Sequence, residues 1–389
     1  MTRPPTAKKQ DFCAGGRLFA DVLAYLLDLA NCYGVDLETA FRRQRENQWN
    51  KDLALISREI GDQTSVNKLP KVELHLHLDC SLSFNVVSRL DPSVTRKEFE
   101  AEFIAPAQCA SLADFLTRAV RGFQLMQTAD ALGLVVEDVF EQLAADHVIY
   151  AEMRFAPLLH LERGLSAEAV VGTVNRAVEN CIRATGIEAR LILCSLRHFS
   201  PEQSLLTAEL AAHFKGSHVV AFDLAGDEAG FALDPHIPSF RFAKEHGIRR
   251  TAHAGEAAGV ESVWQTLRAL EPERIGHGVR SIEDPALMEY LKSHQIHLEV
   301  CPSSNLQTCV VEHYQDHPVN RILRAGLSFG INTDARTTTN ITLNGEYERL
   351  RQHFGWTDSE FAARNRTALE AAFLDEPARK RLAEMLTIP

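Results

Sequence analysis

Four short motifs in this chain carry side chains that together could bind a metal ion and move protons. Imidazole nitrogens and carboxylate oxygens are donor atoms that suit Zn2+. A lone histidine is more often an ordinary polar residue, so the order of the motifs along one chain is what indicates a metal-dependent site. The motifs are His75-Leu76-His77, His253-Ala254-Gly255-Glu256, Gly276-His277-Gly278 and Thr333-Asp334.

The candidate metal ligands come from three of these motifs. Successive side chains of a β-strand alternate between its two faces, so His75 and His77 project from the same face. His253 and Asp334 lie at the ends of two later predicted strands and could complete a set of three histidines and one aspartate. The alternative, four unrelated polar residues, is disfavoured because all four fall at predicted strand ends. We therefore predict one Zn2+ per chain, with a position left open for water.

The two remaining side chains suit proton transfer. His277 lies between two small glycines and can approach the metal closely, where a water must be oriented. Glu256, three residues after His253, is placed to give a proton to a ring nitrogen. The expected chemistry is hydrolysis by an activated water.

The stretches between the motifs predict alternating strands and helices from about Leu69 onward. Serines at Ser111, Ser166 and Ser200 mark helix starts. Eight strands, each followed by a helix, predict a (β/α)8 TIM barrel of the α/β class, whose active sites collect at the carboxyl ends of the strands. A doubly wound open sheet is the alternative. The predicted strands are Lys71–His77, Val148–Phe155, Glu188–Leu196, Val219–Ala225, Arg249–Gly255, Arg274–Gly278, Ile296–Pro302 and Leu327–Asp334.

The residues before the first strand form a separate segment. Arg17–Asn50 carries two amphipathic stretches joined at Gly34, which predicts a helical hairpin. We therefore expect residues 1–66 to be a small helical extension with a linker, and residues 67–389 to be the barrel. Packing or formation of a homodimer is the favoured role of the hairpin.

Composition limits the kinds of partner. The chain has 389 residues and a formal net charge of −11, which offers no basic face for nucleic acid. No apolar run approaches the roughly 18 residues of a membrane span. The eight cysteines include no Cys-x-x-Cys pair, and Met1–Lys9 has no apolar segment typical of a secretory signal. We expect a cytoplasmic enzyme with reduced thiols that binds neither nucleic acid nor membrane and acts on a small molecule.

Six segments, in order, resemble the adenosine deaminase family. The resemblance covers about Lys68 to the C-terminus and implies a zinc-dependent barrel that converts adenosine or deoxyadenosine to inosine or deoxyinosine and ammonia. The segments are Pro70–Asp79, Asp223–Glu228, Thr251–Glu256, Ile275–Gly278, Glu299–Asn305 and Asn332–Asp334.

The resemblance also implies a role for each site residue. His75, His77, His253 and Asp334 would hold Zn2+. Glu256 would protonate the purine N1, and His277 would orient and deprotonate the attacking water. Gly226 would present its backbone to the purine, and Asp79 would bind the sugar 5′-hydroxyl of a purine nucleoside.

Two departures from the family pattern concern the substrate. Ala335 and Arg336 follow the last metal ligand, where the family usually has an aspartate or asparagine that reaches the purine N7. An unpaired buried N7 would cost about 1–3 kcal/mol unless water, Arg336 or Thr337 replaces the missing group. Cys80 stands where a glycine is common.

Several alternatives therefore stay open. The substrate could be a modified 6-aminopurine nucleoside such as aminodeoxyfutalosine or methylthioadenosine, or a mononucleotide such as dAMP, although Asp79 would repel a 5′-phosphate. A catalytically silent relative would have lost a ligand or Glu256, and a zinc amidohydrolase for a non-purine ring would not need the Asp223–Glu228 segment. The deaminase class with Pro-Cys-x-x-Cys ligands is rejected because Cys301 precedes its proline. The N-terminal stretch faintly resembles MazG-type pyrophosphohydrolases but lacks their glutamates.

Overall fold

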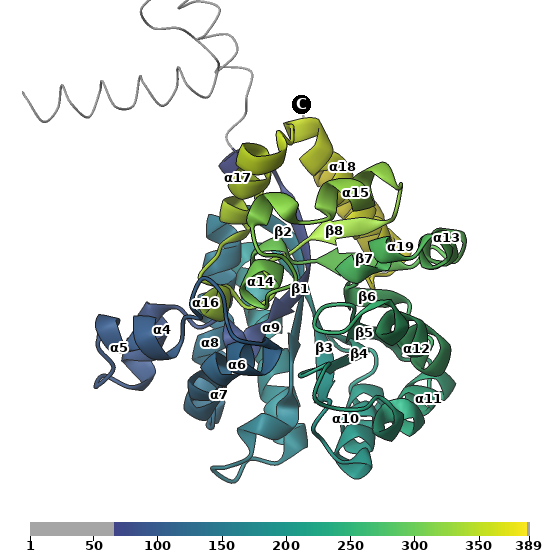
Figure 1. The fold of residues 1–389 in the computed structure, drawn as a ribbon. Coiled ribbons are helices and arrows are strands. Elements are labelled where there is room, and N and C mark those ends of the chain that lie inside the picture. The colour runs from purple at the N-terminus through teal and green to yellow at the C-terminus, as the bar shows by residue number, and fades with distance from the viewer. Residues whose placement is uncertain (1–65, 387–389) are drawn as a thin grey trace, which may run out of the picture. The chain divides into compact units, whose positions relative to one another are not determined.

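The computed structural model describes residues 66–386, in which eight strands are surrounded by helices (Figure 1). The predicted helical extension, with its faint MazG-type resemblance, lies outside the described residues except for Val66. None of the helices within residues 66–386 is both long and apolar enough to cross a bilayer.

The strands form one parallel sheet whose order follows the sequence. Each strand pairs with the next, from β1 to β8. This sequential order confirms the predicted (β/α)8 barrel and excludes the doubly wound sheet, in which the strand order reverses. The strands are β1 Lys71–His77, β2 Val148–Phe155, β3 Glu188–Leu196, β4 Val219–Ala225, β5 Arg249–Ala254, β6 Arg274–His277, β7 His297–Val300 and β8 Phe329–Ile331.

The barrel closes where β8 meets β1, and the predicted eighth strand is too long there. β8 ends at Ile331, and Asp334 has a φ of +66°. The Asp334 N–H donates to His75 O at 3.0 Å, and the His77 N–H donates to Asp334 O at 2.7 Å. Asn332 Oδ1 accepts the Leu74 N–H at 2.7 Å. A side chain and a single left-handed residue therefore replace the regular ladder at the seam.

Helices cover the outside of the barrel, and the three predicted serine caps are confirmed. Ser111, Ser166 and Ser200 accept backbone N–H groups at the starts of α6, α9 and α10. The helices that follow β2 to β6 are α9 Ala167–Thr185, α10 Pro201–His213, α11 Ile237–Glu245, α12 Val260–Leu270 and α13 Pro285–Ser293. The remaining α-helices are α4 Phe84–Leu90, α5 Arg96–Glu102, α6 Leu112–Leu116, α7 Val120–Leu125, α8 Ala129–Ala145, α14 Pro302–Gln307, α15 Val319–Arg324, α16 Arg336–Thr339, α17 Leu343–Phe354, α18 Asp358–Ala371 and α19 Glu376–Met385.

Apolar and charged residues divide between the two sides of the sheet. The large hydrophobic cluster includes Leu76, Met153, Leu193 and Leu224, which pack with the apolar faces of the surrounding helices. Several strand residues with charged side chains, such as Arg154, are nevertheless fully buried. Buried charges need partners, so the polar contacts among the strands decide how the site is held.

Candidate active site

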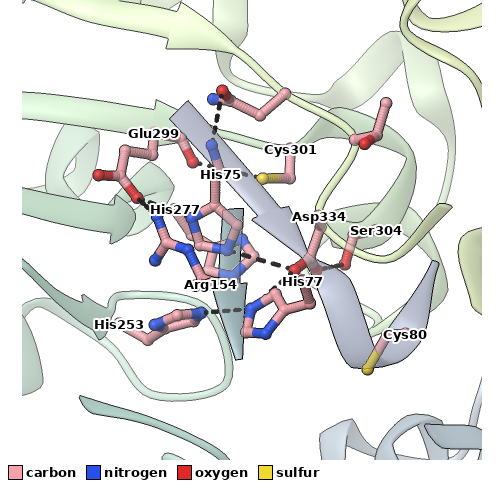
Figure 2. A network of polar contacts seen from close by, with 12 residues as sticks. His75, His77, Cys80, Arg154, His253, His277, Glu299, Cys301, Ser304 and Asp334 are labelled. Atoms are coloured by element: carbon pink, nitrogen blue, oxygen red, sulfur yellow. Dashed lines mark hydrogen bonds and ion pairs between the residues drawn. The ribbon is translucent and has the colours of Figure 1, made fainter. Parts of the chain in front are cut away.

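The four predicted metal donors converge at the carboxyl ends of the strands, and Figure 2 shows them turned toward one another. His75 and His77 come from β1, His253 comes from β5, and Asp334 follows β8. The Nε2 atoms of His77 and His253 are 3.1 Å apart. Asp334 Oδ1 lies 3.2 Å from His75 Nε2 and 3.4 Å from His77 Nε2.

These donors fit a tetrahedral metal ion. Bonds of 2.0–2.1 Å to Zn2+ place the ligand atoms of a tetrahedron about 3.3–3.4 Å apart, close to the separations found here. Apart from its contact with Asp334 Oδ1, the buried His75 Nε2 has no hydrogen-bond partner among the described residues, which is the state expected of a metal ligand. Three imidazole nitrogens and one carboxylate oxygen are also the donor types that zinc favours.

Two of the histidines are oriented by buried carboxylates. His75 Nδ1 lies 2.8 Å from Glu299 Oε2, and His253 Nδ1 lies 3.3 Å from Asp223 Oδ1. A carboxylate accepts the Nδ1–H, which leaves the lone pair of Nε2 facing the other ligands. Both carboxylates therefore select the tautomer that can bind metal.

One guanidinium connects these two carboxylates. Arg154 Nη1 donates to Asp223 Oδ2 at 3.0 Å, and Nη2 donates to Glu299 Oε2 at 2.5 Å. All three side chains are fully buried. Burial alone would raise the pKa of Glu299, but Arg154 and Arg274 together hold this pKa well below its usual range, so the carboxylate stays charged.

The predicted proton-transfer residues lie beside the metal donors. His277 Nε2 is 3.4 Å from Glu256 Oε2, and Thr308 Oγ1 donates to Glu256 Oε1 at 3.0 Å. Burial raises the pKa of Glu256 well above its ordinary value, and the nearby Asp334 and Glu228 charges add to the shift. A carboxyl group with a raised pKa holds a proton at neutral pH and can donate it.

The loop that carries Glu256 is held by another carboxylate, Glu228. Its oxygens accept the N–H groups of Gly255 at 2.7 Å, Glu256 at 3.0 Å and Ala258 at 2.9 Å. A loop fixed by several charge-assisted hydrogen bonds keeps the Glu256 carboxyl in place. Glu228 therefore positions Glu256, the predicted proton donor, through its backbone.

A cavity of about 370 Å3 begins at His77 and contains the two remaining predicted residues, Asp79 and Gly226. Burial raises the pKa of Asp79 to about 6, and Asp79 Oδ2 accepts the Ala156 N–H at 3.1 Å. Gly226 has a φ of +96°, which strains any other residue, so its backbone can line the cavity without a side chain. None of the described lining residues is a lysine or arginine.

The structure also places the residues that follow the last metal donor. Ala335 is buried in a small apolar cluster with Ala105, Cys109, Leu112 and Phe115. Arg336 turns away from the site and forms ion pairs with Glu73 at 2.6 Å and Asp146 at 2.7 Å. Thr337 Oγ1 donates to Leu82 O at 2.6 Å. Neither polar side chain is free to act beside Ala335.

All eight predicted site residues therefore lie at one end of the barrel, but no motif in the sequence indicates the roles of Arg154, Asp223 and Glu299. Each is a charged residue within a buried strand. A charge within an otherwise apolar strand run is a signal that it has a buried partner. Which partner it has is visible only in three dimensions.

Comparisons with known proteins identify the family of this chain. Residues 70–388 match the family model described as adenosine deaminase. An adenosine deaminase of Clostridium botulinum is 35% identical over 331 residues, which cover 82% of this chain and 98% of that protein. Adenosine deaminase 1 of Streptomyces coelicolor is 36% identical, covering 82% of this chain and 85% of the relative. The crystal structure of an adenine deaminase from Arthrobacter aurescens superposes with a TM-score of 0.75 at 26% identity, covering 82% of this chain and 98% of that one.

Removing one donor should release the metal. Because Asp334→Ala and His253→Ala each leave three ligands, we expect the affinity for Zn2+ to fall by more than about 100-fold, beyond the loss typical of an outer partner. Competition with a chromogenic zinc chelator measures this affinity. His294→Ala removes an exposed histidine and is the matched control. A donor variant that binds zinc as tightly as the parent would contradict the assignment.

Proposed function

This chain belongs to the adenosine deaminase family, and we propose that it converts adenosine or deoxyadenosine and water to inosine or deoxyinosine and ammonia. The observation that carries the proposal is the convergence of His75, His77, His253 and Asp334 with Glu256 and His277 in one cluster, whose His77 also lines the cavity. A hydrolytic deaminase needs these groups within reach of one ring carbon.

We propose that His75, His77, His253 and Asp334 hold one Zn2+ per chain. When bound, zinc supplies a Lewis acid that makes water nucleophilic near neutral pH. The protein must place that water against the purine C6 and supply a proton to the ring.

The other site residues divide these tasks. Glu256 gives its proton to the purine N1, which lies next to the carbon under attack, and His277 orients the water. Gly226 presents its backbone to the purine, and Asp79 receives the sugar hydroxyl. The burial of Glu256 and its raised pKa support its role as the acid.

The lining of the cavity supports a nucleoside rather than a nucleotide as the substrate. Asp79 is the buried acid beside the proposed sugar, and no described lining residue carries the positive charge that a phosphate requires. Leu116, Val120, Phe123 and Leu159 make much of the wall apolar. A 6-aminopurine nucleoside with an uncharged sugar fits this chemistry better than AMP or dAMP.

The role of Glu256 is tested by removing only its proton. Glu256→Gln keeps the shape of the side chain but cannot serve as the acid, so the turnover number should fall by at least about 100-fold while zinc stays bound. Steady-state assays and metal analysis of the same preparation measure both quantities. Glu261→Gln changes an exposed residue in the next helix and should leave both unchanged. Near-normal turnover of Glu256→Gln would assign the acid to another group.

The substrate class is tested with a panel of adenosine, deoxyadenosine, adenine, AMP, dAMP, methylthioadenosine and aminodeoxyfutalosine. The loss of absorbance at about 265 nm reports deamination. We expect kcat/KM for adenosine to exceed the values for AMP and adenine, because Asp79 repels a phosphate and a free base lacks the sugar. Asp79→Ala should lower kcat/KM for the nucleosides more than for adenine, which has no sugar. A preference for AMP in the parent would overturn the assignment to nucleosides.

We expect that no protein group donates a hydrogen bond to the purine N7 in this enzyme. The structure directs Arg336 and Thr337 to other partners, and Ala335 sits in an apolar cluster. The parent should therefore deaminate 7-deazaadenosine, which lacks N7, nearly as well as adenosine.

Adding a donor at this place should restore a contact with N7. Ala335→Asn, and Ala335→Asp with its carboxyl protonated, should raise kcat/KM for adenosine by up to about 1–3 kcal/mol of transition-state stabilisation. The gain should be smaller for 7-deazaadenosine. Lower activity of both variants, together with strong discrimination against 7-deazaadenosine by the parent, would show that another group reads N7.

A further inference from the structure

A chain of buried hydrogen bonds leads from a backbone amide to His277. The Val319 N–H donates to His317 Nδ1 at 3.2 Å. His317 Nε2 lies 3.2 Å from Asn305 Oδ1, and Asn305 Nδ2 lies 3.1 Å from His277 Nδ1. Asn305, His317 and His277 are all buried, so no bulk water replaces these partners.

The direction of every bond in this chain is fixed by its first member, because a backbone amide can only donate. His317 Nδ1 must therefore carry a lone pair, and the ring proton of His317 lies on Nε2. Burial lowers the pKa of His317 to about 3, so the ring holds a single proton at neutral pH. The atom of Asn305 that faces Nε2 must then be the carbonyl oxygen.

The same reasoning fixes the tautomer of His277. With its oxygen toward His317, the Asn305 amide directs its N–H to His277 Nδ1, which must accept. The ring proton of His277 consequently lies on Nε2, the nitrogen that is 3.4 Å from Glu256 Oε2 in the site.

We propose that Asn305 is a positioning residue that fixes His277 as a hydrogen-bond donor toward the attacking water. In this tautomer Nε2 has no lone pair, so His277 orients the water but does not take its proton, in contrast to the role that the family resemblance implies. The inference deepens the proposed function and rests on it only in taking the reaction to be attack by water.

The proton of the water then goes to a carboxylate. Both oxygens of Asp334 already have a partner, since Oδ1 belongs to the metal-donor set and Oδ2 accepts Ser304 Oγ at 2.6 Å. We assign the proton to Glu256, whose Oε2 lies 3.4 Å from His277 Nε2. Its carboxyl first gives a proton to N1 and, as a carboxylate, takes one from the water as the C6–O bond forms. The C6–N bond breaks when the amino group takes the proton of the new C6 hydroxyl, so ammonia leaves and Glu256 is protonated as at the start.

Nitrogen-15 NMR of the zinc-loaded full chain, labelled in its histidine rings, tests the tautomer without substrate. His277→Gln identifies the signals of His277. We expect the parent to show a protonated Nε2 and an unprotonated Nδ1. An Nδ1 that carries the proton in the parent would overturn the proposal.

Asn305→Asp tests the consequence for catalysis. A carboxylate can only accept from His277 Nδ1, so Nδ1 should become protonated and kcat should fall by up to about 10⁴-fold, the loss that follows when a catalytic histidine is held in the wrong tautomer. KM should change much less, because the cavity is untouched. If Nδ1 of His277 is protonated in this variant and kcat is unchanged, the proposed role of the Nε2–H donor would be wrong.

Asn365→Asp is the matched control, since Asn365 is equally buried but bonds to Val72 and Tyr347 outside the site. It should leave the His277 signals and kcat unchanged, and a loss equal to that of Asn305→Asp would overturn the specific role. The NMR result does not depend on any substrate. A parent with the expected tautomer but no activity on adenosine would contradict the proposed function alone.

Discussion

The site depends on one buried guanidinium. Arg154 pairs with Asp223 and Glu299, and each of these carboxylates orients one of the histidines proposed to bind the metal. Three buried charges cost a large desolvation free energy, which close ion pairs and further hydrogen bonds must offset. The barrel supplies these contacts by bringing side chains from β2, β4 and β7 to one point, and Arg274 from β6 adds an ion pair with Glu299 at 2.7 Å. Lysine could not replace Arg154, because a single ammonium cannot span both carboxylates as a planar fork does.

Backbone strain near the site also helps to position its side chains. His277 and Asp334 both have φ values in the left-handed region, +59° and +66°. Non-glycine residues pay for this conformation, and they keep it only where surrounding contacts require it. For Asp334 those contacts are the two backbone hydrogen bonds to β1. The turn that closes the barrel therefore also directs the Asp334 carboxylate toward the histidines of β1. Closure of the barrel and assembly of the site depend on the same contacts.

The sequence was sufficient for the fold and for the residues that carry local patterns. Strands β1 to β4 have the predicted bounds because long runs of β-rich residues define them. The predicted β8 is too long, because the Asn332 side chain replaces the ladder that a continued strand would form past Ile331. The roles of Asp223, Glu299 and Arg154 could not be predicted from spacing, because their partners lie dozens of residues away. Contacts of that kind have no local pattern and depend on barrel register.

The same limit applies to how each histidine works. The motif around His277 indicates a catalytic imidazole, but the nitrogen that carries its proton is set by Asn305, which lies 28 residues away in α14. Asn305 is in turn oriented by His317 and the Val319 amide, beyond that helix. A hydrogen-bond donor and a base are opposite roles for one imidazole. Which of the two His277 plays depends on the Val319 N–H, which acts through His317 and Asn305. Residue identity therefore defines which reactions a site can catalyse, whereas the direction of the surrounding hydrogen bonds decides which group gives and which group takes each proton.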